Sequence, residues 1–324
     1  MRDLDGFDRM ILSALQQDGR VTYQALTDQT RLSRTSTRTR LHMLLDQGAA
    51  TVVASAHPAL FGQAVQAQLL VTAHADPAEA AKTLIAHRST SGCQRTTGAN
   101  HDLVVRIRAR DDADLAAEVD QLRRHRAVHR LKVFRAVNVI TDAAEPAPPP
   151  SPGPAASSLD AVDWQLLVLL QDDPRASFST LSQGVGLSQA ATRARVRGLL
   201  EAGVVRIAAV VHPAGAGLPQ ALGFAVSPTT AAEDVGAELA QRPGVTAVAT
   251  GWGPCDILGT AAARSTPHLA AVLGGMRSVG GIDRLTTWTV LDTLAPVTPI
   301  AVRRHRPPRT LTTLDDQPWA PVSP

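Results

Sequence analysis

The sequence predicts an α+β protein of two tandem units, each made of a three-helix domain followed by a βαββαβ domain. The first observation is an internal repeat, because residues 4–62 align with residues 159–217 without a gap. The second is the hydrophobic pattern, which changes within each copy from helical spacing to the short apolar runs of strands. The third is a proline-rich stretch between the copies, at residues 143–158. Together they indicate a duplicated chain with a linker in its middle.

The composition is that of an ordinary globular protein. The chain has 324 residues, enough for two to four small domains, and its formal net charge of +3 alone does not indicate nucleic-acid binding. Two thiols, Cys93 and Cys255, are too few for a disulfide framework or a cysteine zinc site. The sequence has no long apolar run and no signal peptide after Met1, so we expect a cytoplasmic protein with no membrane span. We also expect no metal and no cofactor.

The beginning of each unit predicts three short helices. In the first copy Asp5 is a good N-cap for the first helix, and residues 18–20 form a turn. A second short helix covers residues 23–30, and a third begins after Ser33. Three short helices with a tight turn before the third are typical of a helix-turn-helix. The β-prone stretch 50–56 then predicts a strand that leads away from it.

The third helix has one apolar face and one basic face. Ser33 can cap its first turn, and Gly48 lies where a left-handed residue would end it. Leu41 and Leu44 share one face, whereas the other carries arginine and hydroxyl side chains and no acid. Such a helix fits the groove of double-stranded DNA, and a merely solvated basic face is the alternative. The candidate DNA contacts are Ser33, Arg34, Thr35, Ser36, Arg38, Thr39, Arg40 and His42.

The second copy repeats this helix with different side chains at the reading positions. Gln189-Ala190-Ala191 stands where the first copy has Arg34-Thr35-Ser36. A small apolar side chain can meet a thymine methyl group but reads no hydrogen bond, so we expect two unequal half-sites. Arg40 and its counterpart Arg195 have two interpretations, a contact to DNA or an internal brace of the domain. The candidates in this copy are Ser188, Gln189, Ala190, Thr192, Arg193, Arg195 and Arg197.

The rest of each unit predicts the order βαββαβ, which is the ferredoxin-like motif. In the first copy the expected elements cover residues 65–75, 76–87, 94–97, 103–109, 111–124 and 128–140. In the second they cover residues 220–227, 231–242, 245–250, 256–262, 267–276 and 282–294. The open sheet face needs a cover, so we expect the copies to pair face to face as an intramolecular pseudo-dimer. Its reading helices would lie about 34–36 Å apart. Pairing between chains is the alternative.

These features resemble the Lrp/AsnC family, the leucine-responsive or feast/famine transcription regulators. The resemblance rests on a Leu-Asp-x-x-Asp opening, here at Leu4 and Leu159, on an arginine at the next turn, and on a Leu-Ser start of the third helix. It implies a winged helix-turn-helix domain that binds DNA and a ferredoxin-like domain that dimerises and binds an effector. Most members carry one unit in each chain, whereas this sequence carries two.

The resemblance also implies an amino-acid-like effector beside a glycine-led turn of each ferredoxin-like domain. The turns here, from Gly98 to Asp102 and from Gly251 to Asp256, are a residue or two longer than the common Gly-x-x-Asp spacing. The alternative is that each glycine serves only the turn and each aspartate only begins a strand. The candidate effector-binding residues are Gly98, Asn100, Asp102, Gly251, Gly253 and Asp256.

The expected domain boundaries follow from the repeat. They are a helix-turn-helix domain at 1–62, a ferredoxin-like domain at 63–142, the linker at 143–158, a second helix-turn-helix domain at 159–217, a second ferredoxin-like domain at 218–297 and a tail at 298–324. We expect the tail, with its prolines and the basic run 303–306, to be disordered. Contact of that run with phosphates is the alternative.

An enzyme is not indicated, and no catalytic residue is predicted. The sequence has no nucleotide-binding glycine loop, no nucleophile elbow and no histidine pair at metal-binding spacing. Two alternatives share the architecture that the resemblance implies. One is a siroheme-decarboxylase-like enzyme, a class that also occurs as fusions of two units. The other is an architectural DNA-binding protein, which would protect long stretches of DNA without one preferred site.

Overall fold

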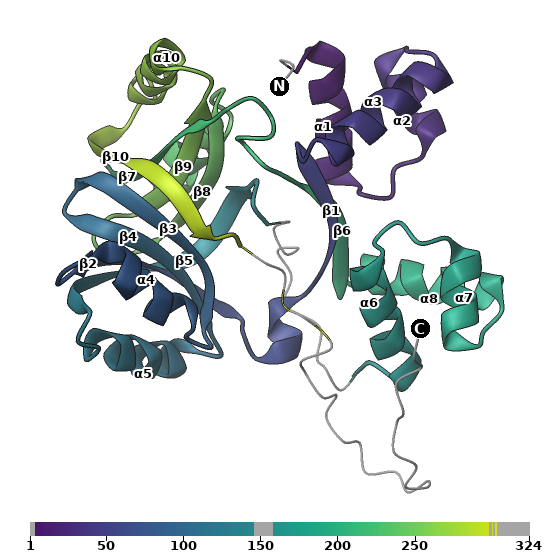
Figure 1. Cartoon of the computed structure of the whole chain (residues 1–324), viewed down its shortest axis with the longest axis horizontal. Coiled ribbons are helices and arrows are strands. Elements are labelled where there is room, and N and C mark those ends of the chain that lie inside the picture. Colours follow the sequence, from purple (N-terminus) through teal and green to yellow (C-terminus); the bar gives the residue numbers. More distant parts are fainter. Residues whose placement is uncertain (1–3, 146–157, 298–299, 301, 303–324) are drawn as a thin grey trace, which may run out of the picture.

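The computed structural model describes residues 4–145 and 158–297, together with Ile300 and Val302. The predicted α+β class and the tandem arrangement are confirmed. Two three-helix domains lie beside a closed barrel of eight strands, and a two-stranded ribbon runs between the two helical domains (Figure 1).

Each three-helix domain packs around a small apolar core. In the first domain Ile11, Leu26 and Leu44 are fully buried. The first helix begins with a capping box, in which Asp5 accepts from the Asp8 amide at 3.0 Å and Asp8 accepts from the Asp5 amide at 3.1 Å. The elements are α1 (Gly6–Gln17), α2 (Tyr23–Thr30), α3 (Arg34–Asp46) and β1 (Ala50–Ala56), then α6 (Ala161–Asp172), α7 (Phe178–Val185), α8 (Gln189–Glu201) and β6 (Val205–Val211).

The two helical domains are joined to each other as well as to the barrel. The predicted exit strands β1 and β6 pair antiparallel along their full length, from Ala50 opposite Val211 to Ala56 opposite Val205. Beside this ribbon, Arg20 donates two hydrogen bonds to backbone carbonyl oxygens between α6 and α7, at 2.6 and 2.9 Å. In the reciprocal contact, the Arg175 guanidinium donates to two backbone carbonyl oxygens between α1 and α2, at 2.6 and 3.2 Å. The repeated turn arginine therefore clamps one copy to the other.

The two βαββαβ halves form one barrel in the order β10-β3-β4-β2-β5-β8-β9-β7. The first half consists of β2 (Val65–Ala73), α4 (Pro77–Ile85), β3 (Thr90–Ala99), β4 (His101–Ala109), α5 (Asp112–Arg123) and β5 (Val128–Asp142). The second consists of β7 (Gln220–Pro228), α9 (Ala232–Ala240), β8 (Val245–Trp252), β9 (Ile257–Ala263), α10 (Thr266–Arg277) and β10 (Ile282–Ala295). A short 3-10 helix, η1 (Pro58–Phe61), which the sequence did not predict, precedes β2.

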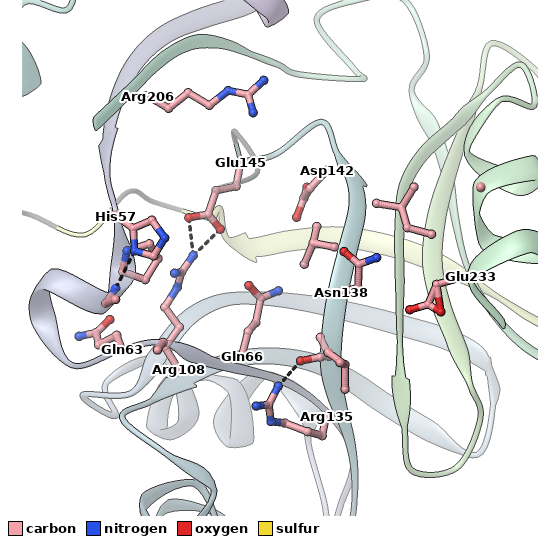
Figure 2. Close-up of a pocket in the computed structure, with 18 of the residues that line it drawn as sticks. His57, Gln63, Gln66, Arg108, Arg135, Asn138, Asp142, Glu145, Arg206 and Glu233 are labelled. Carbon is pink, nitrogen blue, oxygen red and sulfur yellow. Dashed lines mark hydrogen bonds and ion pairs between the residues drawn. The ribbon is translucent and has the colours of Figure 1, made fainter. Parts of the chain in front are cut away.

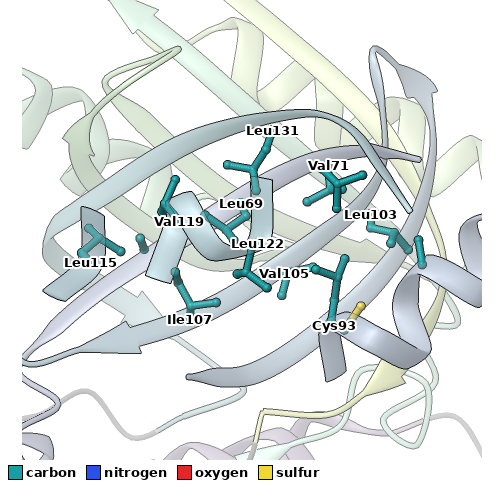
Figure 3. Close-up of a cluster of buried hydrophobic side chains, with 14 of the residues drawn as sticks. Leu69, Val71, Cys93, Leu103, Val105, Ile107, Leu115, Val119, Leu122 and Leu131 are labelled. Carbon is teal, nitrogen blue, oxygen red and sulfur yellow. The ribbon is translucent and has the colours of Figure 1, made fainter. Parts of the chain in front are cut away.

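Closure buries the inner face of each half-sheet, and the helices cover the outer face. Inside the barrel, Phe134 of β5 and Trp288 of β10 occupy equivalent positions of the two copies and pack with Leu258. On the outer face of the first half, α5 lays Leu115 and Leu122 over the strands (Figure 3). The expected pairing of the copies is therefore present within one chain. The copies also hydrogen-bond at their edges, through β5 with β8 and β3 with β10, which was not predicted.

The predicted linker and tail need correction at their beginnings. Ala143 donates to the Thr246 carbonyl oxygen of β8 at 2.8 Å and accepts from the Val211 amide of β6 at 3.2 Å. Glu145 is buried, with 7% of its surface exposed. In the tail, Val302 is buried against the α6 domain. Residues 146–157 and the basic run 303–306 lie outside the described residues.

Both cysteines are free and buried, and burial raises the pKa of each thiol to about 12. None of the helices in the described ranges has the length and apolar character needed to cross a membrane.

We predict that His101 makes stability pH-dependent. Its ring is buried against Trp288, with centroids 4.7 Å apart, and burial lowers its pKa to about 4. Between pH 6.5 and 4 the unfolded state takes up a proton that the folded state does not, so stability present above pH 6.5 is lost as the pH falls. His101→Phe should remove about 2–3 kcal/mol of this loss, measured by denaturant unfolding across that interval.

The exposed His129→Phe is the matched control and should keep the wild-type slope. An unchanged slope in His101→Phe would contradict the prediction.

Candidate DNA-binding surface and ligand cavity

The first reading helix, α3, is held by its cap and its apolar face. The Ser33 hydroxyl accepts from the Ser36 amide at 3.2 Å, so Ser33 supports the helix. Thr37, Leu41 and Leu44 are buried in the domain core. Gly48 is left-handed at φ +68°, as the sequence predicts. These contacts fix which side of α3 faces outward.

The outward side of α3 carries exposed cations and hydroxyl groups. Arg34, Thr35, Arg38 and Thr39 are exposed, whereas Ser36 is half-buried. Within the described residues neither Arg34 nor Arg38 has an ion pair or a hydrogen bond through its guanidinium. His42 is exposed and hydrogen-bonds the Tyr23 hydroxyl at 3.2 Å. The two arginines are therefore available to a ligand of opposite charge.

Arg40 lies in an internal ion-pair network. Its guanidinium contacts the Asp5 and Asp8 carboxylates, both at 2.7 Å. Asp8 is fully buried, and the Arg40 side chain is 20% exposed. The Asp8 backbone amide, together with Arg40, lowers the pKa of Asp5 to about 2. The geometry is that of a brace between α3 and the start of α1, the second of the two interpretations given above.

The second reading helix, α8, has the same frame and a different outer face. Ser188 caps it, and Arg195 contacts Asp160 and Asp163 at 2.6 and 2.9 Å, repeating the brace. Gln189 and Ala190 are exposed at its start.

Two further residues predicted to bind DNA in α8 also have contacts within the domain. Thr192 is fully buried, and its hydroxyl donates to the Ser188 carbonyl oxygen at 3.0 Å. It supports the helix and cannot reach a base edge, which corrects its assignment. The Arg193 guanidinium stacks on Phe178 at 4.9 Å from the ring centroid, but the residue remains exposed. Arg197 is exposed.

The glycine-led turn of the first ferredoxin-like half is used for local structure. Gly98 adopts φ +93°. The Asp102 carboxylate accepts from the Ala73 amide at 2.8 Å, and the Asn100 carbonyl oxygen accepts from the Thr72 hydroxyl at 3.0 Å. Both contacts fasten the end of β2.

In the second half the turn lies against the first half. A Cβ atom on Gly251 would come within 2.0 Å of the Arg135 carbonyl oxygen, and one on Gly253 within 2.2 Å of the Val133 carbonyl oxygen. These glycines are needed because the β8 backbone approaches β5 so closely. The Gly251 amide also donates to the Asp256 carbonyl oxygen at 2.9 Å.

A cavity of about 860 Å³ opens beside the barrel, where the η1 segment, β5 and α9 meet (Figure 2). Its volume lies in the range of small-molecule sites. Its lining includes none of the six predicted effector-binding residues. The polar and charged residues that line it are His57, Gln63, Gln66, Arg108, Arg135, Asn138, Asp142, Glu145, Arg206, Glu233 and Asp234.

Buried ion pairs dominate one side of this cavity. The Arg108 guanidinium contacts the Glu145 carboxylate, and Arg106 contacts Asp142 at 2.7 Å. Arg108 is 5% exposed, and among the described residues its Nε atom has no hydrogen-bond partner. Burial lowers the pKa of His57, which lines the same side. This side can accept an anion if Glu145 moves away.

Arg106, Arg108 and Glu145 were not predicted from the sequence as site residues. A signal was present, because Arg106 and Arg108 interrupt an otherwise apolar strand. The same strand in the second copy has Thr260 and Ala262 at those places. Glu145 was assigned to the linker, so its contact with Arg108 could not be anticipated.

Known families match both helical domains. A model described as winged helix-turn-helix DNA-binding matches residues 4–49, and the AsnC-type helix-turn-helix domain model matches residues 159–200. An uncharacterized HTH-type transcriptional regulator of Pyrococcus abyssi is 32% identical over 139 residues, 42% of this chain and 87% of that protein. The HTH-type transcriptional regulator FL11 of Pyrococcus horikoshii is 26% identical over 148 residues, 45% of this chain and 97% of that protein.

The whole tandem arrangement has a counterpart among solved structures. The siroheme decarboxylase NirDL covers 90% of this chain and 93% of its own, with a TM-score of 0.60 and 14% identity. At this identity the likeness shows the fold alone.

We predict that Arg34 and Arg40 have separable roles. Arg40→Met leaves buried Asp8 without its cation and should cost about 2 kcal/mol of stability, less than a fully buried pair because Arg40 is partly exposed. Arg34→Met should leave the unfolding midpoint unchanged and weaken DNA binding by roughly tenfold or more. Denaturant unfolding and fluorescence anisotropy on DNA at fixed salt measure the two effects.

Arg195→Met is the matched variant in the second copy and should cost less stability than Arg40→Met, because Arg195 and Asp163 are more exposed than Arg40 and Asp8. If Arg40→Met weakened DNA binding without loss of stability, Arg40 would be a DNA contact and the brace interpretation would be wrong.

Proposed function

We propose that this chain binds double-stranded DNA sequence-specifically through two unequal reading helices. The chain belongs to the Lrp/AsnC family of helix-turn-helix transcriptional regulators, and the proposal proceeds from that membership. The observation that carries the proposal is the exposed pair Arg34 and Arg38 on α3, which has no counter-ion within the described residues. A guanidinium can donate two hydrogen bonds to a guanine edge, and such a pair contributes about 1–3 kcal/mol of discrimination.

The two readers differ in what they offer to DNA. Reader 1 (Arg34, Thr35, Ser36, Thr39 of α3) offers a guanidinium and hydroxyl groups to base edges. Reader 2 (Gln189, Ala190, Ala191, Ala194 of α8) offers one amide and small apolar groups. Beside reader 2, we assign the exposed Arg193 and Arg197 to phosphates, which fix position but carry no sequence information. The first half-site is therefore read more stringently than the second.

We also propose that a small amino-acid-like effector tunes this activity through the ferredoxin-like halves. Two sites are candidates, the glycine-led turns at residues 98–102 and 251–256 and the cavity beside β5. The first is implied by the family. At the turns, however, the Asp102 carboxylate already holds β2 and Gly251 is packed against β5.

The test is selection of operators from random double-stranded DNA with the full-length chain. We expect one well-defined and one degenerate half-site, spaced about one helical turn apart, and a steep loss of affinity with added salt. The quadruple variant Arg34→Gln, Thr35→Ala, Ser36→Ala, Thr39→Ala gives reader 1 the side chains of reader 2 and should return two equally degenerate halves. A perfect palindrome from the wild-type chain would refute unequal reading, and long unspecific protection in footprinting would indicate an architectural protein.

A further inference from the structure

The turn between α2 and α3 contains an arginine with a strained backbone. Arg31, the C-cap of α2, has φ +56° and ψ +23°, in the left-handed region. Within the described residues it is the one residue other than glycine with a positive φ. A Cβ atom in this conformation crowds the following carbonyl oxygen, so the position favours glycine and any larger residue destabilises the fold. Such strain points to a function when the fold itself gains nothing from the side chain.

The second copy shows that the fold does not need an arginine in this turn. The counterpart is Gly186, at φ +68° and ψ +27°, so the backbone is nearly the same. In each copy the amide of this residue donates to a carbonyl oxygen of the preceding helix, that of Thr27 or that of Ser182. The Leu-Ser start of the reading helix follows in both copies. Glycine therefore builds the same turn without strain.

The Arg31 side chain has no use inside the protein. It is exposed, and within the described residues its guanidinium has neither an ion pair nor a hydrogen bond. The sequence has no acidic residue from Arg31 to Leu45. Arg31 thus adds a third cation to Arg34 and Arg38, which are also unpaired among the described residues. A cation just before a reading helix is suited to the phosphate backbone, which carries the charge of DNA.

We propose that Arg31 binds a backbone phosphate of the first half-site and so positions reader 1 on the DNA. A phosphate contact fixes the register and orientation of a protein on the duplex and carries no sequence information. The second copy has glycine at this place and lacks the contact. The inference rests on the proposed DNA-binding function and deepens it, because the copy with the more selective face is then also held more firmly.

The experiment is fluorescence anisotropy of the full-length chain over a series of salt concentrations, on the selected operator and on a duplex of unrelated sequence. Arg31→Gln should lower the slope of log affinity against log salt by about 0.9, the contribution of one neutralised phosphate. In about 0.1 M salt binding should weaken roughly eightfold, the factor that this slope gives between 0.1 M and 1 M. The loss should be the same on both duplexes, and Arg31→Lys should keep the wild-type slope because it keeps the charge.

Exchanging the residues between the copies separates the contact from the strain. Arg31→Gly should weaken DNA binding as Arg31→Gln does, and it should raise the urea midpoint of unfolding because glycine adopts the left-handed backbone freely. Gly186→Arg should do the reverse, with a slope steeper by about 0.9 and a lower urea midpoint. An arginine with only a structural role would move the midpoint and leave the slope unchanged.

The matched control is Arg126→Gln. Arg126 is an exposed arginine without an ion pair in the described part of the chain, and it follows α5, which lies across the barrel from α3 (Figure 1). This variant should leave the affinity and the salt slope unchanged. If Arg31→Gln lowers the slope no more than Arg126→Gln does, Arg31 is a solvated side chain and the inference is overturned.

Operator selection and the salt slope together separate this inference from the proposed function. If the wild type selects an operator and Arg31→Gln binds it with the wild-type slope, the proposed function stands and the phosphate contact is wrong. If Arg31→Gln lowers the slope but selection returns no preferred sequence, the contact stands and sequence-specific reading is wrong. If the wild type binds neither duplex at any salt concentration, both are wrong.

Discussion

Hydrogen bonding between the edges of the two half-sheets is the constraint on which the rest of the structure depends. A four-stranded sheet alone would leave one apolar face and two rows of backbone groups uncovered. Pairing of β5 with β8 and of β3 with β10 satisfies the two rows of backbone groups. It also closes the barrel over the apolar face, with Phe134 and Trp288 inside. The close approach requires glycine at position 251. Because both copies belong to one chain, this closure does not depend on protein concentration, as it does when separate chains pair.

The same duplication fixes the helical domains relative to each other. The β1–β6 ribbon and the reciprocal contacts of Arg20 and Arg175 join them, so the two reading helices belong to one frame. Within each domain an arginine of the third helix is bound to the capping aspartates of the first, as in the Arg40 network. These repeated contacts are structural, and they leave Arg34 and Arg38 without an ion pair among the described residues.

The places where the two copies differ are the places with functional interest. In the readers, Arg34-Thr35-Ser36 has diverged from Gln189-Ala190-Ala191 on otherwise similar frames. In the barrel, Arg108 has an alanine counterpart, and the cavity that it lines lies on one side of the pseudo-dimer. A homodimer of single units would carry each feature twice. A tandem chain can place one stringent reader and one charged cavity in the same molecule.

The sequence by itself determined the elements, because local signals suffice for them. The N-caps Asp5 and Ser33, the left-handed Gly48 and the strand periodicity are each contained within a few residues, and the gapless repeat extended them to the second copy. It left open whether Arg40 touches DNA, and it listed Thr192 among the DNA contacts. Tertiary structure showed Arg40 bound to Asp5 and Asp8 and Thr192 buried, together with the edge pairing and the contact of Arg108 with Glu145. Each depends on the distance between residues far apart in the chain, and such distances exist only after the copies pack.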